Sequence, residues 1–186
     1  YSGVGKKFEE LKFAISKKIL LINVESQSEL KNIEKLAKRL KKKVSVGLRL
    51  NPNIDAKTNT KISTGRIQDK FGLNGNDIIK ILKKFKESKN IKIKCLSVHI
   101  GSQITQNKPY NNVLVEITKI LSKSKYKFEY IDLGGGMGIK YLKNNKKINY
   151  YKLSKDIYKF SKKNNCKIIF EPGRSIVGNT AVLLTK

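Results

Sequence analysis

The sequence predicts an α/β fold in which parallel strands alternate with helices. Short apolar runs recur along the 186 residues, and segments with apolar residues at helical spacing lie between them. Four of the runs end in polar or glycine-rich segments, at 49–52, 99–103, 132–136 and 171–174. The carboxyl ends of parallel strands are where α/β enzymes place their sites, so we expect a site at this edge of the sheet.

The apolar runs are predicted to be strands, and the last one leads directly into Glu171 and Arg174. We expect that last strand to be buried, because Ile168, Ile169 and Phe170 follow one another in it. Residues 1–5 are predicted to be the end of a further strand and a turn. The predicted strands cover residues 19–24, 44–50, 91–100, 128–133 and 167–170.

Helices are predicted between the strands from apolar residues three and four positions apart. Ser26 and Glu29 fit a capping box at the start of the second helix, in which each side chain satisfies a backbone N–H of the other. Asn76 is predicted to cap the third helix. Residues 51–75 have no strong period and form a long loop, and long loops in compact domains are usually functional. The predicted helices cover 8–18, the segment from Ser26 to Leu40, the segment from Asn76 to Phe85, 107–123 and 151–164.

Both a doubly wound sheet and a (β/α)8 barrel fit this order of elements. A barrel typically needs about 250 residues, so this chain would be an incomplete one. The first residue is Tyr1 rather than Met, and the sequence stops within the apolar run that begins at Ala181. We therefore expect a fragment of a longer protein.

A formal net charge of +27 invites a nucleic-acid interpretation. The lysines are scattered over every segment and few aromatic residues lie among them, which favours a coding bias toward lysine over a selected basic surface. Cys95 and Cys166 have no metal-like spacing and are expected to be buried and reduced, as in a cytoplasmic protein. No apolar stretch approaches the roughly 20 residues that span a bilayer, so no membrane partner is expected.

The strand ends carry residues that suit an anionic ligand with a protonated nitrogen. Gly134–Gly136 would let backbone N–H groups approach a phosphate, or would only make a tight turn. His99 would stack on a ligand, or would be a core histidine; as the only histidine, it gives no metal site. Glu171 would hold a ligand proton and Arg174 would bind an anion, or the two would form an ion pair with each other.

These segments together resemble the fold-type III pyridoxal-phosphate decarboxylases, and among them the diaminopimelate decarboxylases most closely. The likeness covers almost the whole chain and keeps the order of the family's motifs. It rests on Arg49-Leu50-Asn51-Pro52, Ile62-Ser63-Thr64-Gly65, Lys70-Phe71-Gly72, His99-Ile100-Gly101-Ser102-Gln103, Asp132-Leu133-Gly134-Gly135-Gly136 and Glu171-Pro172-Gly173-Arg174.

The resemblance implies pyridoxal 5'-phosphate as cofactor and a role for each matched residue. His99 would stack on the pyridine ring, Ser102 would lie near the phosphate, and Glu171 would pair with the pyridine nitrogen. Arg174 would contact the phosphate region and also the substrate carboxylate. The implied cofactor-binding set is His99, Ser102, Gly135, Gly136, Glu171, Pro172, Gly173 and Arg174.

The resemblance also implies a partial (β/α)8 TIM barrel of the alanine-racemase-like type over residues 1–180. The first barrel strands, with the lysine that forms the Schiff base, would lie upstream of Tyr1; Lys57 follows Ala56 but lies in a loop, so we do not assign it that role. A C-terminal β domain would begin at 181–186 and would supply a cysteine to the partner subunit of a homodimer. No catalytic residue is thus expected in this fragment, which should be inactive alone.

The implied reaction is decarboxylation of meso-2,6-diaminopimelate to L-lysine and carbon dioxide, in lysine biosynthesis. Gln103 and the segment from Ile62 to Gly72 favour this substrate over those of sister enzymes, which act on ornithine, arginine or carboxynorspermidine. Two other hypotheses stay open: a basic nucleic-acid-binding domain, and a phosphate-binding barrel with a different ligand and no need for Glu171.

Overall fold

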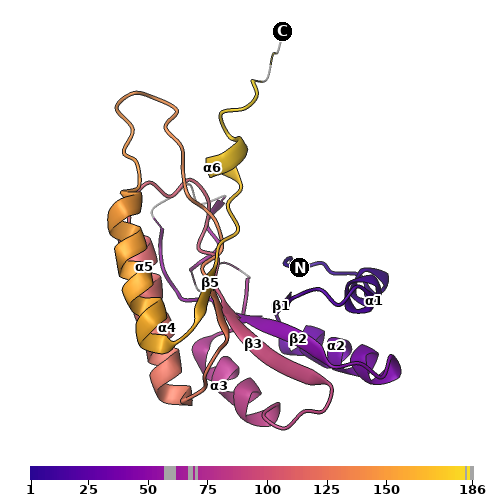
Figure 1. Ribbon diagram of the computed structural model, residues 1–186. Helices are drawn as coiled ribbons and strands as arrows, with labels where there is room; N and C mark the ends of the chain where they lie inside the picture. The colour runs from indigo at the N-terminus through magenta and orange to yellow at the C-terminus, as the bar shows by residue number, and fades with distance from the viewer. Residues whose placement is uncertain (57–61, 67–68, 70, 183, 185–186) are drawn as a thin grey trace.

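The computed structural model describes residues 1–56, 62–66, 69, 71–182 and 184, and it alternates strands with helices as predicted (Figure 1). Lys57 and Lys70, which the sequence analysis discussed, lie outside the described residues. The elements are α1 (Phe8–Ser16), β1 (Ile22–Val24), α2 (Gln27–Arg39), β2 (Val44–Arg49), α3 (Gly75–Lys84), β3 (Ile91–Ser97), α4 (Lys108–Ser124), β4 (Tyr130–Asp132), α5 (Tyr150–Asn164), β5 (Lys167–Ile169) and α6 (Arg174–Val177).

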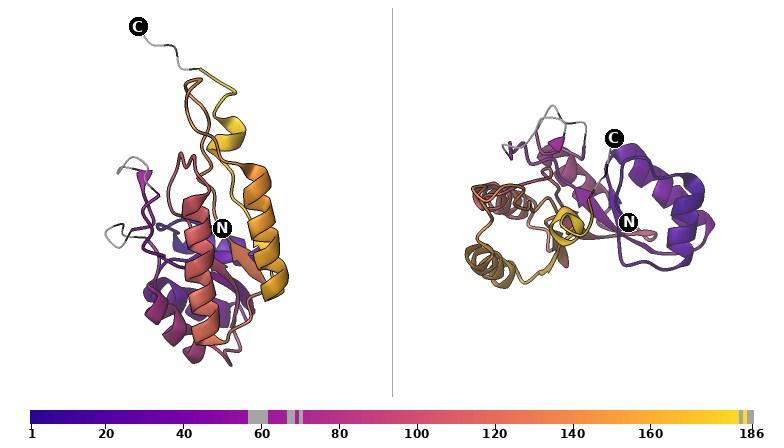
Figure 2. Two further views of the ribbon diagram at one scale, coloured as in Figure 1. Left: turned by 90° about the vertical axis from the view of Figure 1, so that its left-hand side faces the viewer. Right: turned by 90° about the horizontal axis from the view of Figure 1, so that it is seen from above.

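The strands form one parallel sheet in the order β1-β2-β3-β4-β5. A doubly wound sheet reverses its strand order at a switch point, whereas a barrel adds each strand beside the last. The described strands never reverse, so the doubly wound alternative is wrong and the sheet is an arc of a barrel. Figure 2 shows the longer helices arranged around the outside of this arc, whereas α6 (yellow) lies beyond the ends of the strands.

Contacts across the inside of the arc confirm its curvature. Asn23 on β1 donates a hydrogen bond to Asp132 on β4 over 3.0 Å. In a flat sheet these strands would lie three spacings apart, or about 14 Å. The sheet therefore bends enough for side chains of its first and fourth strands to meet.

Neighbouring strands share an apolar row on the side of the helices, and β2, β3 and β4 share a polar row on the inside of the arc. Val24, Leu48, Leu96 and Ile131 pair in register and are buried in the main apolar core. The next row holds Arg49, Ser97 and Asp132, again in register. Because side chains alternate between the faces of a strand, the second row points to the opposite side from the core.

The third helix begins two residues earlier than the sequence suggested. Its cap is Asn74, whose side-chain oxygen accepts a hydrogen bond from the Asp77 N–H at 2.9 Å, and Asn76 lies inside the helix. Both asparagines suit a cap, but the cap must lie two or three positions before the N–H that it satisfies. The Asp77 N–H lies three positions after Asn74 but only one position after Asn76, so Asn74 alone can cap it.

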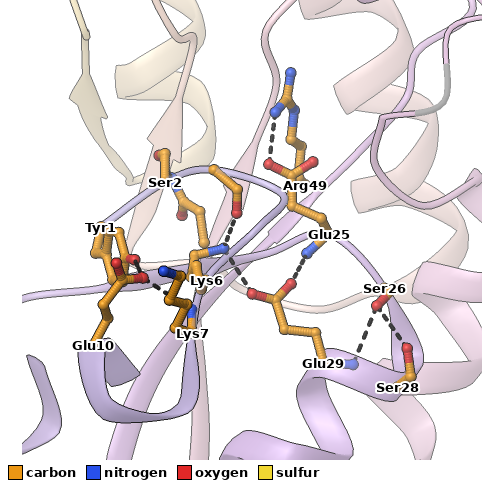
Figure 3. A network of polar contacts seen from close by, with 12 residues as sticks. Tyr1, Ser2, Lys6, Lys7, Glu10, Glu25, Ser26, Ser28, Glu29 and Arg49 are labelled. Atoms are coloured by element: carbon orange, nitrogen blue, oxygen red, sulfur yellow. Dashed lines mark hydrogen bonds and ion pairs between the residues drawn. The ribbon is translucent and has the colours of Figure 1, made fainter. Parts of the chain in front are cut away.

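At the start of α2 the predicted capping box is half formed (Figure 3). Ser26 Oγ accepts from the Glu29 N–H at 3.1 Å, as expected. Glu29 reaches back one residue further than predicted, to the N–H of Glu25 at 2.7 Å, because its other oxygen binds the Lys6 ammonium at 2.7 Å. This ion pair ties the segment before α1 to the start of α2.

Three strand predictions need correction. Residues 1–5 contain the expected turn, at Val4 and Gly5, but no strand. The run at 91–100 is a strand only to Ser97, since the chain then turns through the positive φ of Gly101 and Gln103. β5 is not a buried strand: Lys167 is exposed and Phe170 is 38% exposed. It is the last strand of the arc and has a neighbour on one side only. None of the helices in the described residues has the length and apolar character needed to cross a membrane.

Candidate functional site

The predicted site segments meet at the carboxyl ends of β3, β4 and β5, where the glycine run packs tightly. Gly134 and Gly136 have φ of +65° and +91°, which favours glycine. A Cβ on Gly136 would lie 2.2 Å from the carbonyl oxygen of Gly101, and one on Gly135 would lie 2.1 Å from that of Glu171. The glycines thus allow three backbone segments to lie in contact.

His99 is held by this glycine run. Its Nδ1 accepts a hydrogen bond from the Gly135 N–H at 3.2 Å, which places any ring proton on Nε2. Burial lowers the pKa of His99, and the positive charge of Arg49 lowers it further. The ring is therefore neutral at neutral pH and half-buried, with its orientation fixed by the loop that follows β4.

Glu171 and Arg174 do not pair with each other. Glu171 Oε1 accepts from Ser2 Oγ at 2.8 Å, and the Arg174 guanidinium donates to the Tyr141 hydroxyl at 2.5 Å. No ion pair joins the two among the residues that the structure describes. The predicted alternative of a mutual ion pair is therefore wrong, and each charge has a neutral partner at the open end of the arc.

The remaining predicted residues lie on the same edge. Ser102 donates its N–H to the Ile62 carbonyl at 3.2 Å. It follows Gly101, whose carbonyl lies against Gly136. Pro172 is exposed, and Gly173, also exposed, precedes α6. The fold thus brings the whole predicted set to one edge of the sheet, around β3, β4 and β5.

Sequence reasoning gave no role to two buried residues that support this edge. The Tyr110 hydroxyl donates to the Gly135 carbonyl at 2.8 Å from α4, where helical spacing indicated only a core residue. Asp132 is 1% exposed and accepts from the Gly134 N–H at 2.9 Å and from Asn23. A buried acid inside a strand was the signal that could have found it.

The Asp132 carboxyl is expected to titrate near pH 6. Burial raises its pKa from the ordinary value of 3.8 to about 6, and the Glu171 carboxylate adds to the rise. Between these two pH values the folded state holds a proton that the unfolded state has lost. The contribution of this group to folding stability therefore falls as pH rises through that window, by about 3 kcal/mol in all. Carboxyl-carbon NMR with Asp132→Asn for assignment checks this, and a midpoint at or below the ordinary value would contradict it.

Arg49 forms a buried ion pair with Glu25 (Figure 3). The charged atoms lie 2.7 Å apart, with side chains 11% and 6% exposed. Glu25 Oε2 has no hydrogen-bond partner among the described residues. Removal of the arginine would leave a buried carboxylate without its cation.

Arg49→Ala is accordingly expected to lower the free energy of unfolding by about 3–5 kcal/mol. Lys119→Ala is the matched control, because its bond to Glu116 is also 2.7 Å but its side chain is 58% exposed. The control should cost less than about 1 kcal/mol. Urea unfolding followed by circular dichroism measures both, and equal losses would refute the assignment of a buried pair.

The described residues hold no group of three or more potential metal ligands from His, Cys, Asp and Glu. Cys95 and Cys166 are buried and unpaired with each other, and burial raises the pKa of both thiols. Neither cysteine is suited to act as a nucleophile.

Comparison with known proteins identifies the family of the chain. The family model described as pyridoxal-dependent decarboxylase, pyridoxal binding domain, matches residues 1–178. The chain belongs to this family. Diaminopimelate decarboxylase of Zymomonas mobilis is 38% identical over the whole chain, and that of Aquifex aeolicus is 36% identical. The chain spans 45% of the length of each of these relatives, somewhat less than half.

Solved structures of the family share the fold. Diaminopimelate decarboxylase of Helicobacter pylori, crystallised with L-lysine, superposes with a TM-score of 0.88 at 37% identity, over 94% of this chain and 45% of that one. An arginine decarboxylase of Paramecium bursaria Chlorella virus superposes at 0.72 with 21% identity, over 91% of this chain and 44% of that one, which shows the fold alone. The α/β barrel prediction is confirmed.

The residues present fit the family's pyridoxal phosphate. Gly134 and Gly135 are buried and their N–H groups donate to Asp132 and His99. Gly136 is half-buried, and its N–H makes no hydrogen bond within the described part of the chain. A phosphate requires donors of this kind. Three side chains lie around the glycine run. The neutral His99 ring supplies a flat surface, Glu171 a carboxylate that can accept a proton, and Arg174 a positive charge.

Proposed function

We propose that this chain is the pyridoxal-binding part of a diaminopimelate decarboxylase, which converts meso-2,6-diaminopimelate to L-lysine and carbon dioxide. The observation that carries the proposal is the convergence of Glu171, His99 and the glycine run on one sheet edge. Identity of 35–38% to diaminopimelate decarboxylases across the whole chain supports this substrate.

Each residue has a distinct task in the proposed mechanism. The Gly136 N–H would bind the phosphate, with Gly135 and Ser102 beside it. His99 would stack on the pyridine ring. Bound pyridoxal phosphate supplies the sink for the electrons released when the carbon–carbon bond breaks.

Glu171 holds a proton on the pyridine nitrogen, because a carboxylate stabilises a positive charge within hydrogen-bond distance. That proton keeps the ring electron-poor. Arg174 binds phosphate or the substrate carboxylate, and its present partner Tyr141 is a neutral hydroxyl that an anion can replace at little cost. These side chains orient the reacting groups. The net charge of +27 has no role in this mechanism.

We further propose the domain boundaries and the oligomeric state that the resemblance implied. Residues 1–180 form the pyridoxal-binding barrel and 181–186 begin the β domain. Pro172 and Gly173 would hold Glu171 and Arg174 at the edge of the cofactor site. The whole protein is a cytoplasmic homodimer that acts on a small amino acid.

Release of labelled carbon dioxide by the full-length protein with pyridoxal phosphate tests this function. We expect release from carboxyl-labelled meso-diaminopimelate and much less from ornithine or arginine. The 186-residue chain alone should release none. Preference for ornithine or arginine would contradict the substrate, and turnover by the short chain would contradict the view that it lacks catalytic groups.

A further inference from the structure

A chain of hydrogen bonds joins Asp132 to Glu171 across the inside of the arc. Asn23 Nδ2 donates to Asp132 Oδ2 at 3.0 Å and also to Ser2 Oγ at 3.0 Å. Ser2 Oγ in turn donates to Glu171 Oε1 at 2.8 Å. The four residues come from β1, the segment before α1, the end of β4 and the segment after β5, so the chain links parts of the sequence that are far apart.

The direction of these bonds follows from the chemistry of the groups. Asp132 also accepts from the Gly134 N–H, and an ionised carboxylate can only accept, so it faces the NH2 group of Asn23. Both amide protons of Asn23 are then used. Since the Ser2 oxygen accepts one of them, its single proton is directed at Glu171.

The fold makes room for Asn23 at a structural cost. Its Oδ1 is buried and has no hydrogen-bond partner among the described residues. A Cβ on Gly47 of β2 would lie 2.2 Å from that oxygen, so only glycine leaves space for the amide. Asn23 is 4% exposed, and its N–H donates to the Tyr1 carbonyl at 2.9 Å, which fixes the residue next to Ser2.

We propose that Asn23 is a positioning residue, which acts through Ser2 to fix the orientation of the Glu171 carboxylate. Asp132 anchors the amide from the other side. The proposal rests on the proposed function only for what Glu171 then does, which is to hold the proton of the pyridine nitrogen. Without Asn23, the Ser2 hydroxyl can rotate away and Glu171 loses its fixed donor.

The test is a double-mutant cycle in the full-length protein, with Asn23→Ala, Ser2→Ala and both together. The first measurement is the carboxyl-carbon NMR resonance of Glu171 in protein without cofactor, assigned with Glu171→Gln. Each single change should move this resonance by a similar amount, and the second change should add nothing. Asn90→Ala is the matched control, because this amide donates to the Lys42 carbonyl at the opposite end of the strands and should leave the resonance in place.

The second measurement is the dissociation constant of pyridoxal phosphate, followed by absorbance. We expect it to rise about three- to tenfold in each single variant and no further in the double variant. Additive effects, or an unmoved Glu171 resonance in Ser2→Ala, would overturn the proposal. Ser2 is exposed, so this variant should fold even where Asn23→Ala does not. If the Glu171 resonance shifts non-additively as expected but the protein binds no pyridoxal phosphate, the proposed function is refuted and the positioning role stands.

Discussion

Glu171→Ala in the full-length protein is expected to lower the turnover number for diaminopimelate by about a hundred- to a thousandfold. The carboxylate stabilises positive charge on the pyridine nitrogen, which matters most as negative charge develops in the transition state. The dissociation constant of pyridoxal phosphate should rise far less, because phosphate contacts through the glycine run remain. Steady-state rates and cofactor titration together separate the two effects.

Glu129→Ala is the control for this variant. Glu129 directly precedes β4, at the opposite end of the strand from the site, and its carboxylate pairs with Lys94 at 3.3 Å. Its loss should leave turnover within about twofold, as expected for an exposed surface pair. A Glu171→Ala enzyme with turnover near that of the control would show that this residue does not tune the cofactor.

Gly136→Ala is expected to weaken pyridoxal phosphate binding by about tenfold to a hundredfold. Its φ of +91° disfavours any side chain, and the new Cβ would meet the Gly101 carbonyl at 2.2 Å. That contact is with backbone, so the loop itself must shift and the N–H groups that face the phosphate shift with it. Absorbance titration measures the affinity, and thermal unfolding should show a loss of stability in parallel.

Gly5→Ala is the matched control, since a Cβ there would meet nothing within 4 Å. It should leave both cofactor affinity and melting temperature unchanged. Equal effects of the two substitutions would mean that the conformation of the glycine run is not what binds the phosphate.

The sequence predicted most helices and strands well, because the formation of each one depends on residues that are close together along the chain. Apolar spacing located β2 and α5 to within a few residues, and Ser26 was correctly named as a cap. It did not give the strand order, which depends on contacts such as that between Asn23 and Asp132, 109 positions apart. Nor did it show that β5 is the edge of the arc and so partly exposed.

The site could be predicted in its location but not in its contacts. The polar ends of the strands indicated His99, Glu171 and Arg174, and resemblance gave them roles. The partners of these residues are Gly135, Ser2 and Tyr141, which come from other segments. Gly135 lies in the glycine run that the sequence already indicated, whereas Ser2 and Tyr141 carry no local signal. From the sequence alone, Asn23 is an ordinary strand residue and Tyr110 an ordinary helix residue. Only the folded arrangement of the segments places them beside the site.

A crystal structure of the full-length protein with pyridoxal phosphate would test the account most directly. It should show the phosphate within hydrogen-bond distance of the Gly136 N–H and the pyridine ring against His99. The ring nitrogen should lie about 3 Å from the Glu171 carboxylate, the distance of a charged hydrogen bond. A cofactor bound with its nitrogen beyond reach of Glu171, or at another edge of the barrel, would contradict the central claim.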